Sequence, residues 1–202
     1  MIRYLAALVA SGFVGIGAAG AGEAPEAEAF IVDLVTELKA NAEAEGEGSI
    51  AVRETLEANL ASEAIGKFLL AGKAADSATD RQTARYRALF PKYIAAAYAE
   101  EIGQLASRDI RIDNSIVRRP GDVLVESRLF NSRGIPKADI VWRVRVADGT
   151  HKLLDVLVEG TSPLITRRQV FSERVRQEGI EGLLTYMEET IAAGITIETD
   201  AD

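Results

Sequence analysis

One stretch near the C-terminus decides the fold: HKLLDVLVEGTSPLITRRQVFSERVRQEGIEGLLTYM, residues 151–187. Residues 153–158 are apolar apart from Asp155 and are followed by a glycine-containing turn, a pattern typical of a strand buried on at least one face. Apolar side chains then recur at helical spacing in two series, at positions 170, 171 and 175 and at positions 180, 183, 184 and 187. The pattern predicts a strand, a turn and two amphipathic helices, with Thr166 as the N-cap of the first helix and Gly179 as its end.

Three further strands precede this stretch. Apolar and polar residues alternate over residues 108–117, 122–130 and 140–146, and the short links between these segments include an Asp-Gly pair, a strong hairpin signal. With residues 152–158 they predict an antiparallel meander with one apolar face. In the first strand, that face is expected to hold Ile110, Ile112 and Ile116. Helices before and after the sheet have to cover the face, so the predicted fold class is α+β: a four-stranded antiparallel sheet covered on one side by several helices.

The N-terminal half is predicted to be helical. Apolar residues recur at helical spacing within residues 30–38, 50–70 and 86–102. Thr79 and Gln82 have the spacing of a capping box, with Thr79 as the N-cap. Pro91 is expected either to kink the helix that follows or to begin a new helix as its first residue.

Composition excludes several classes of function. The chain has 202 residues, 48% of them hydrophobic, which is enough for one domain with a substantial core. Its net charge of −8 argues against nucleic acid as a partner. It has no cysteine and a single histidine, so thiol chemistry is excluded and no metal or cofactor is expected. Nucleotide-binding and hydrolase motifs are missing from the sequence.

The polar residues of the strands offer little for catalysis. His151 begins a strand beside a turn and has no second histidine or cysteine with which to share a metal. Asp155 and Glu159 lie four residues apart, hence on one face of a strand, and a carboxylate pair for acid–base chemistry is one interpretation. The other is a solvated sheet face on which they pair with Arg143 or Arg145. We expect the second interpretation to hold and the protein not to be an enzyme.

The N-terminus has the form of a secretory signal peptide. Arg3 is the only charge before an uncharged run rich in small residues, 4–20, and a site of the A-x-A type ends at Ala21. The alternative interpretation is an uncleaved membrane anchor, for which this run is short. We expect residues 1–21 to be removed by cleavage after Ala21, which leaves residues 22–202 as a single exported domain.

Several short motifs, in their order along the chain, resemble one known family. They comprise the run FLLAG at 68–72, then Phe90, Tyr93, Ile94 and Tyr98, then Val158-Glu159-Gly160-Thr161-Ser162, then Arg168 and Phe171, and the run GIEGLL at 179–184. This set is similar to the MlaC family, the periplasmic phospholipid-binding proteins of the Mla, or toluene-tolerance, lipid transport system. The resemblance extends over residues 30–187 and is weakest at residues 73–76, where the family usually has a more aromatic segment.

The resemblance implies a phospholipid shuttle in the periplasm. Such a protein carries phospholipid between an outer-membrane complex of a lipoprotein with a porin and an inner-membrane ABC transporter that contains an MCE-domain subunit. The outcome is maintained lipid asymmetry of the outer membrane. The chain has no ATP-binding motif, so energy would come from a partner. Two alternatives stay open: a secreted small-ligand-binding protein or enzyme, and an adaptor with a packed core and no lipid.

A phospholipid carrier needs an enclosed apolar pocket of lipid size. Each methylene removed from water contributes about 0.8 kcal/mol, so two acyl chains with roughly 15 buried methylenes each amount to about 24 kcal/mol. We expect this pocket between the apolar face of the sheet and the helices that cover it. The candidate lining residues are Val125, Leu129, Ile140, Trp142, Val144, Val156 and Val158 from the strands and Tyr93, Tyr98 and Phe171 from the helices.

Arg167 and Arg168 are candidates for contact with the lipid headgroup or with a partner. Cations are disfavoured in the first turn of a helix, so two of them there indicate a nearby anion. That anion is either an acidic side chain of the protein (Asp155, Glu159 or Glu173) or a lipid phosphate or an acidic patch on a transport partner.

Overall fold

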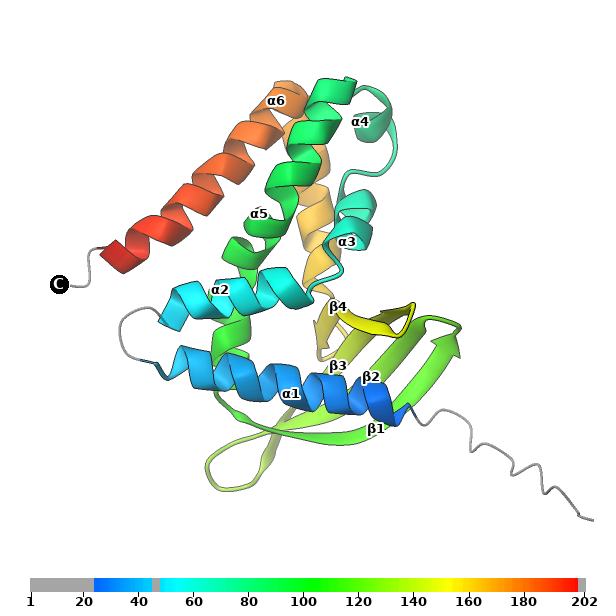
Figure 1. Ribbon diagram of the computed structural model, residues 1–202, viewed down its shortest axis with the longest axis vertical. Helices are drawn as coiled ribbons and strands as arrows, with labels where there is room; N and C mark the ends of the chain where they lie inside the picture. The colour runs from blue at the N-terminus through cyan, green and yellow to red at the C-terminus, as the bar shows by residue number, and fades with distance from the viewer. Residues whose placement is uncertain (1–23, 45–47, 200–202) are drawn as a thin grey trace, which may run out of the picture.

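The computed structural model describes residues 24–44 and 48–199 (Figure 1). The predicted signal peptide, residues 1–21, lies outside the described residues and stays a prediction. Within the described part of the chain, no helix is both long and apolar enough to cross a membrane.

The strands form one four-stranded antiparallel sheet whose order follows the sequence, β1-β2-β3-β4. Their bounds are Asp109–Arg119 for β1, Asp122–Phe130 for β2, Pro136–Ala147 for β3 and Thr150–Val158 for β4. The link between β3 and β4 is the predicted Asp148-Gly149 pair, and both residues have positive φ, 50° and 72°. Positive φ at both positions is what a two-residue hairpin turn requires. The predicted α+β meander is therefore confirmed.

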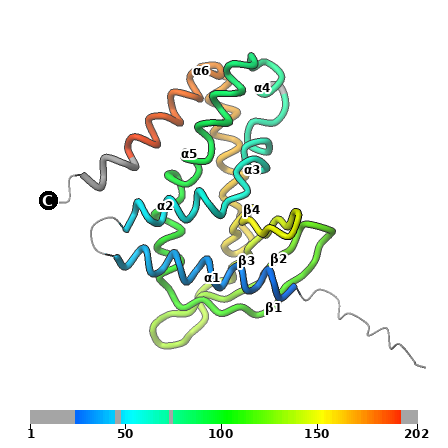
Figure 2. Tube along the Cα trace, viewed as in Figure 1, coloured from blue at the N-terminus to red at the C-terminus, as the bar shows by residue number. Residues whose placement is uncertain are grey.

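The helices lie before and after the sheet in the chain. Their bounds are Pro25–Ala42 for α1, Gly48–Asn59 for α2, Ser62–Leu69 for α3, Lys73–Asp76 for α4, Asp80–Ala106 for α5 and Pro163–Thr199 for α6. Helix α1 packs across β1 and β2, whereas α5 and α6 stand side by side and extend away from the sheet (Figures 1 and 2). The chain leaves β4 directly into α6, which rises beside α3 and α5 (Figure 2).

The sequence signals for the helix ends are confirmed in part. The predicted capping box of α5 is confirmed: Thr79 Oγ1 accepts a hydrogen bond from the backbone N of Gln82 (3.3 Å), and Gln82 Oε1 accepts one from the backbone N of Thr79 (2.9 Å). Pro91 lies inside α5 and does not end it. The prediction that Thr166 is an N-cap is wrong, because α6 begins at Pro163, whose fixed φ suits the first turn of a helix.

The apolar face of the sheet is centred on Trp142, which has no exposed surface. Its indole Nε1 donates to Ser127 Oγ (2.9 Å), and that hydroxyl donates to the carbonyl oxygen of Ile140 (3.2 Å). The polar atoms of Trp142 and Ser127 are thus satisfied, which avoids a cost of about 1–3 kcal/mol for each buried group left without a partner. Val125 and Val144 are completely buried on the same face.

A β-bulge changes the strand parity of β1. The register with β2 shifts between Ile112 and Asn114, so Ser115 turns inward, with 0% of its surface exposed, and Ile116 turns outward, with 36% exposed. The prediction that Ile116 lies on the apolar face is therefore wrong, since one extra residue reverses every later side chain. Ser115 Oγ accepts a hydrogen bond from the backbone N of Ala24 (2.7 Å) and so ties β1 to the start of α1.

An ion-pair cluster lies on the opposite face of the sheet, around Asp122. This carboxylate accepts hydrogen bonds from Nε and Nη2 of Arg143 (both 2.8 Å) and from Nε of Arg119 (3.2 Å). The bonds from Arg143 hold the pKa of Asp122 below its usual range, although burial works in the other direction. The prediction that Asp155 and Glu159 pair with Arg143 or Arg145 is wrong, since no ion pair joins them within the described residues. Arg143 is opposite Asp155 in the register, but its guanidinium turns to Asp122.

We predict that Asp122→Asn lowers the free energy of unfolding at pH 7 by about 2–3 kcal/mol, because it removes charge-assisted hydrogen bonds to a buried carboxylate. The pKa of Asp122 is lower in the folded than in the unfolded chain, so its contribution is present above about pH 4 and is lost as the pH falls through the lowered pKa. Urea denaturation at pH 7 and pH 3 measures the difference between the two proteins, which should shrink at pH 3. An equal difference at both pH values would contradict the ionic role of Asp122.

Candidate functional site

A groove of about 640 Å³ opens between β4, α5 and the first turns of α6. We call it the β4–α5 groove, and its wall is mostly apolar. It is lined by Leu60, Ile65, Ile94, Tyr98, Glu101, Ile102, Leu105, Leu153, Leu154, Asp155, Val156, Val158, Thr161, Pro163, Leu164, Thr166, Arg167 and Val170. The groove therefore borders the sheet at β4, the strand from which the chain passes into α6.

Two local features of the sequence build this wall. On α5, four large side chains spaced three or four residues apart share one face of the helix: Ile94, Tyr98, Ile102 and Leu105. On β4, the register with β3 shifts between Leu153 and Asp155, so Leu154 is an extra residue. Because of this bulge, Leu153 and Val156 are both buried although their positions have opposite parity.

Arg167 is the cation of the groove. Its Nη1 donates to the hydroxyl of Tyr186 (3.0 Å) and its Nε to the hydroxyl of Tyr98 (3.5 Å), and its guanidinium carbon lies 5.2 Å from the centroid of the Tyr98 ring. Among the described residues, no carboxylate lies within ion-pair distance of Arg167. Burial acts to lower the pKa of Arg167, but the tyrosine hydroxyls outweigh it and raise the pKa, so the guanidinium stays charged. A half-buried cation with only neutral partners is suited to an anionic ligand.

Asp155, one of two acidic residues that line the groove, joins β4 to α6. Its Oδ2 accepts a hydrogen bond from Ser162 Oγ (2.6 Å), and its Oδ1 accepts one from the backbone N of Val156 (2.9 Å). Burial raises the pKa of Asp155, against the effect of these hydrogen bonds. Because Ser162 directly precedes Pro163, the first residue of α6, the Asp155–Ser162 bond fixes where the helix leaves the sheet. It thereby positions Arg167, one turn further along.

Helix α6 folds back on itself at Gly179, and this brings Arg167 to Tyr186. In a straight helix these two residues, 19 positions apart, would be separated by about 28 Å along the axis. Gly179 instead has φ 70° and ψ −175°, a conformation almost restricted to glycine. The second limb of α6 consequently turns back and runs beside α5 (Figure 1). The predicted end of the first helix at Gly179 is confirmed.

The structure divides the predicted lipid-pocket residues into two groups. Tyr98, Val156 and Val158 line the groove. The others pack in the hydrophobic core: Tyr93, Val125, Leu129, Ile140, Trp142, Val144 and Phe171. Sequence reasoning missed Ile94, Ile102 and Leu105, although their helical spacing with Tyr98 was a usable signal.

The two candidate headgroup residues also separate. Arg167 lines the groove, whereas the guanidinium carbon of Arg168 lies 4.8 Å from the centroid of the Phe68 ring. Arg168 is exposed. His151, the histidine considered for catalysis, stacks on Phe30 with 6.0 Å between ring centroids. Within the described residues, no group of three or more acidic or histidine side chains is arranged to hold a metal.

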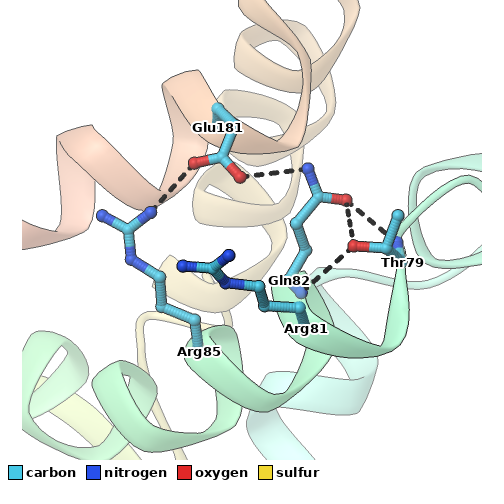
Figure 3. Close-up of a pocket in the computed structure, with 5 residues that line it drawn as sticks. All are labelled: Thr79, Arg81, Gln82, Arg85 and Glu181. Atoms are coloured by element: carbon cyan, nitrogen blue, oxygen red, sulfur yellow. Dashed lines mark hydrogen bonds and ion pairs between the residues drawn. The ribbon is translucent and has the colours of Figure 1, made fainter.

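A second, polar depression of about 410 Å³ lies between the start of α5 and α6 (Figure 3). Its walls are formed by Thr79, Arg81, Gln82, Arg85 and Glu181. The carboxylate of Glu181 accepts hydrogen bonds from Gln82 Nε2 (3.1 Å) and Arg85 Nη1 (2.9 Å), as Figure 3 shows. Gln82, Arg85 and Glu181 already satisfy one another and hold α5 to the second limb of α6, so the depression is better explained as a contact between helices than as a ligand site.

The fold is thus α+β, with an open, mostly apolar groove beside β4. A family model described as MlaC protein matches residues 28–189, and the chain belongs to the MlaC family. Among solved structures, it is similar to the phospholipid-binding protein from Ralstonia solanacearum in complex with a phospholipid. The TM-score is 0.65 at 16% sequence identity, over 87% of this chain and 99% of that one. At this identity the match shows a shared fold.

We predict that Gly179→Ala destabilises the protein by roughly 1–3 kcal/mol, because alanine cannot take the backbone conformation of Gly179 without strain. Urea denaturation measures this loss, and Ser172→Ala on the exposed side of α6 provides the control, with little or no loss expected. If Gly179→Ala were as stable as the wild type, the fold-back of α6 would not depend on this glycine.

Proposed function

We propose that this protein is a phospholipid carrier that performs no chemical step. The observation that carries the proposal is the β4–α5 groove, an apolar space of about 640 Å³ in a fold shared with a protein in complex with a phospholipid. Its volume falls within the range of roughly 300–1,000 Å³ that small-molecule pockets occupy. Membership of the MlaC family supports a binding and transport protein rather than an enzyme.

In this proposal the acyl chains lie against β4 and α5. The two walls of the groove are formed by apolar side chains that are largely shielded from water, among them Leu153, Val156 and Ile102. Each methylene that moves from water to this surface contributes about 0.8 kcal/mol, so the chains supply most of the affinity. The remaining predicted pocket residues, such as Trp142 and Phe171, lie in the core behind the groove lining and would contact lipid only if the groove widens.

The headgroup phosphate is proposed to bind Arg167. This guanidinium lies on the groove wall, keeps its charge, and has tyrosine hydroxyls as its partners. It is also in the opening turns of α6, where the free backbone N–H groups and the helix dipole favour an anion. Arg168, exposed over Phe68, is the candidate for contact with a transport partner.

The wider role follows from the family. We infer that residues 1–21 export the chain to the periplasm and that residues 22–202 act there as one domain. The proposed partners are an MCE-domain subunit of an inner-membrane ABC transporter and an outer-membrane lipoprotein–porin complex. The carrier would exchange phospholipid with both and so help to maintain outer-membrane lipid asymmetry.

Native mass spectrometry tests the proposal directly. The full chain is expressed in a bacterium, and the exported protein is purified from the periplasm without detergent. We expect about one phospholipid per chain, which organic extraction and lipid analysis then identify. A folded, lipid-free protein that also takes up no phospholipid from vesicles would contradict the proposal and favour an adaptor without a lipid.

We predict that Val158→Asp reduces the amount of bound phospholipid several-fold, because it places a charge on the groove wall, where burial of acyl chains leaves it poorly solvated. Val158 is 41% exposed, so the change should cost the apo fold little. Val117→Asp is the matched control: Val117 is 48% exposed on β1 and does not line the groove. Equal lipid content in the two variants would place the lipid elsewhere.

A further inference from the structure

The β4–α5 groove carries charges of both signs on an otherwise apolar wall. Asp155 comes from β4, Glu101 from α5 and Arg167 from α6, and all three line the groove. Charges are costly on a surface that has to be dry when a lipid is bound, unless they find partners. The partners of these groups within the protein therefore indicate which charges a ligand is left to neutralise.

No cation of the described residues lies within ion-pair distance of Asp155. The sheet register places Arg143 directly opposite it, but Nε and Nη2 of that guanidinium donate to Asp122 at 2.8 Å, and Arg143 acts on Asp155 only at longer range. What Asp155 receives is two neutral donors, Ser162 Oγ and the backbone N of Val156. These donors hold the carboxylate in place, and its negative charge has no ion pair among the described residues.

Arg167, for its part, has no acidic partner among the described residues. Its donors are directed to the hydroxyls of Tyr98 and Tyr186, which are neutral, and no carboxylate of the described chain reaches it. Asp155 and Arg167 come from different elements, β4 and α6, and do not pair with each other although both line the same groove. The groove thus presents an anion, Asp155, and a cation, Arg167, at separate points, and neither has an ion pair among the described residues.

We propose that the groove prefers zwitterionic phospholipids whose headgroup carries an ammonium, with the phosphate at Arg167 and the ammonium on the side of Asp155. The inference rests on the proposed function and adds the class of headgroup to it. A zwitterionic lipid neutralises both groups at once. An anionic lipid such as phosphatidylglycerol satisfies Arg167 alone and adds a negative charge to a wall that already holds two carboxylates and one guanidinium.

Competition between two headgroups tests the inference. The protein, expressed as the full chain and purified from the periplasm, is delipidated and incubated with vesicles of equal parts phosphatidylethanolamine and phosphatidylglycerol that have identical acyl chains. It is then separated from the vesicles, and its bound lipids are extracted and quantified. We expect bound phosphatidylethanolamine to exceed phosphatidylglycerol by about fivefold, the ratio that one partly exposed ion pair supports.

Two variants assign this preference to its residues. Asp155→Asn keeps a hydrogen-bond acceptor for Ser162 but removes the charge, and it should bring the ratio close to that of the vesicles with total lipid retained. Arg167→Gln should reduce the binding of both lipids. Asp148→Asn removes a carboxylate in the β3–β4 turn, away from the groove, at a position of positive φ that asparagine tolerates, and it should keep the wild-type ratio.

The possible results distinguish a failure of the headgroup preference from a failure of the carrier function. Uptake of both lipids in the vesicle ratio by the wild type would overturn the headgroup preference and leave the carrier function standing. No uptake of either lipid would overturn the carrier function itself. If Asp155→Asn does not fold, the wild-type ratio still decides the preference.

Discussion

The apolar face of the sheet has to be kept from water, and the helices cover it unevenly. Near β1 and β2, α1 packs on the strands, and Trp142 and Val125 are completely buried. At β4 the cover is incomplete: Val156 is 8% exposed and Val158 is 41% exposed, and the space between β4 and α5 is the groove. Burial of apolar surface contributes about 25 cal/mol of stabilising free energy for each Å², which is lost where that surface stays in water. An acyl chain in the groove would complete the core that the helices leave open.

The exit from β4 sets the geometry of the site. Glu159 and Gly160 both have positive φ, 50° and 73°, and Val158 and Thr161 exchange backbone hydrogen bonds of 2.9 and 3.2 Å across the turn. The Asp155–Ser162 hydrogen bond then fixes the start of α6. The fold-back of α6 at Gly179 brings Tyr186, on the second limb, to the guanidinium of Arg167, on the first limb. The turn after β4, the Asp155–Ser162 bond and the fold-back of α6 thus place Arg167 on the apolar wall of the groove, and no long loop is needed.

How far the sequence predicted the structure depended on how local each signal is. The four strands and the capping box of Thr79 were predicted because their patterns need only neighbouring residues. The inward turn of Ser115 was not, because the bulge in β1 has no marker in the side chains around it. The partner of Arg143 was missed because the choice between Asp122 and Asp155 depends on side-chain direction across two strand pairings.

The candidate site shows the same division. Strand parity correctly placed Val125, Ile140 and Val144 on the apolar face, but parity does not say where the helix layer separates from the sheet. That separation occurs at β4, so Trp142 lies in the packed core while Val158 lies on the groove. Arg167 was suspected because the sequence placed it in the first turn of a helix, but α6 begins earlier, at Pro163, and the tyrosine partners of Arg167 depend on the fold-back at Gly179.

We propose that the β4–α5 groove, and not the rest of the apolar core, receives the lipid. A crystal structure of the exported protein loaded with a single phospholipid species tests this. We expect acyl chains between β4 and α5, in contact with Leu153, Val156 and Ile102, and a phosphate oxygen within hydrogen-bond distance of the Arg167 guanidinium. A lipid bound on another surface, with no lipid in the groove between β4 and α5, would show that the groove is not the binding site.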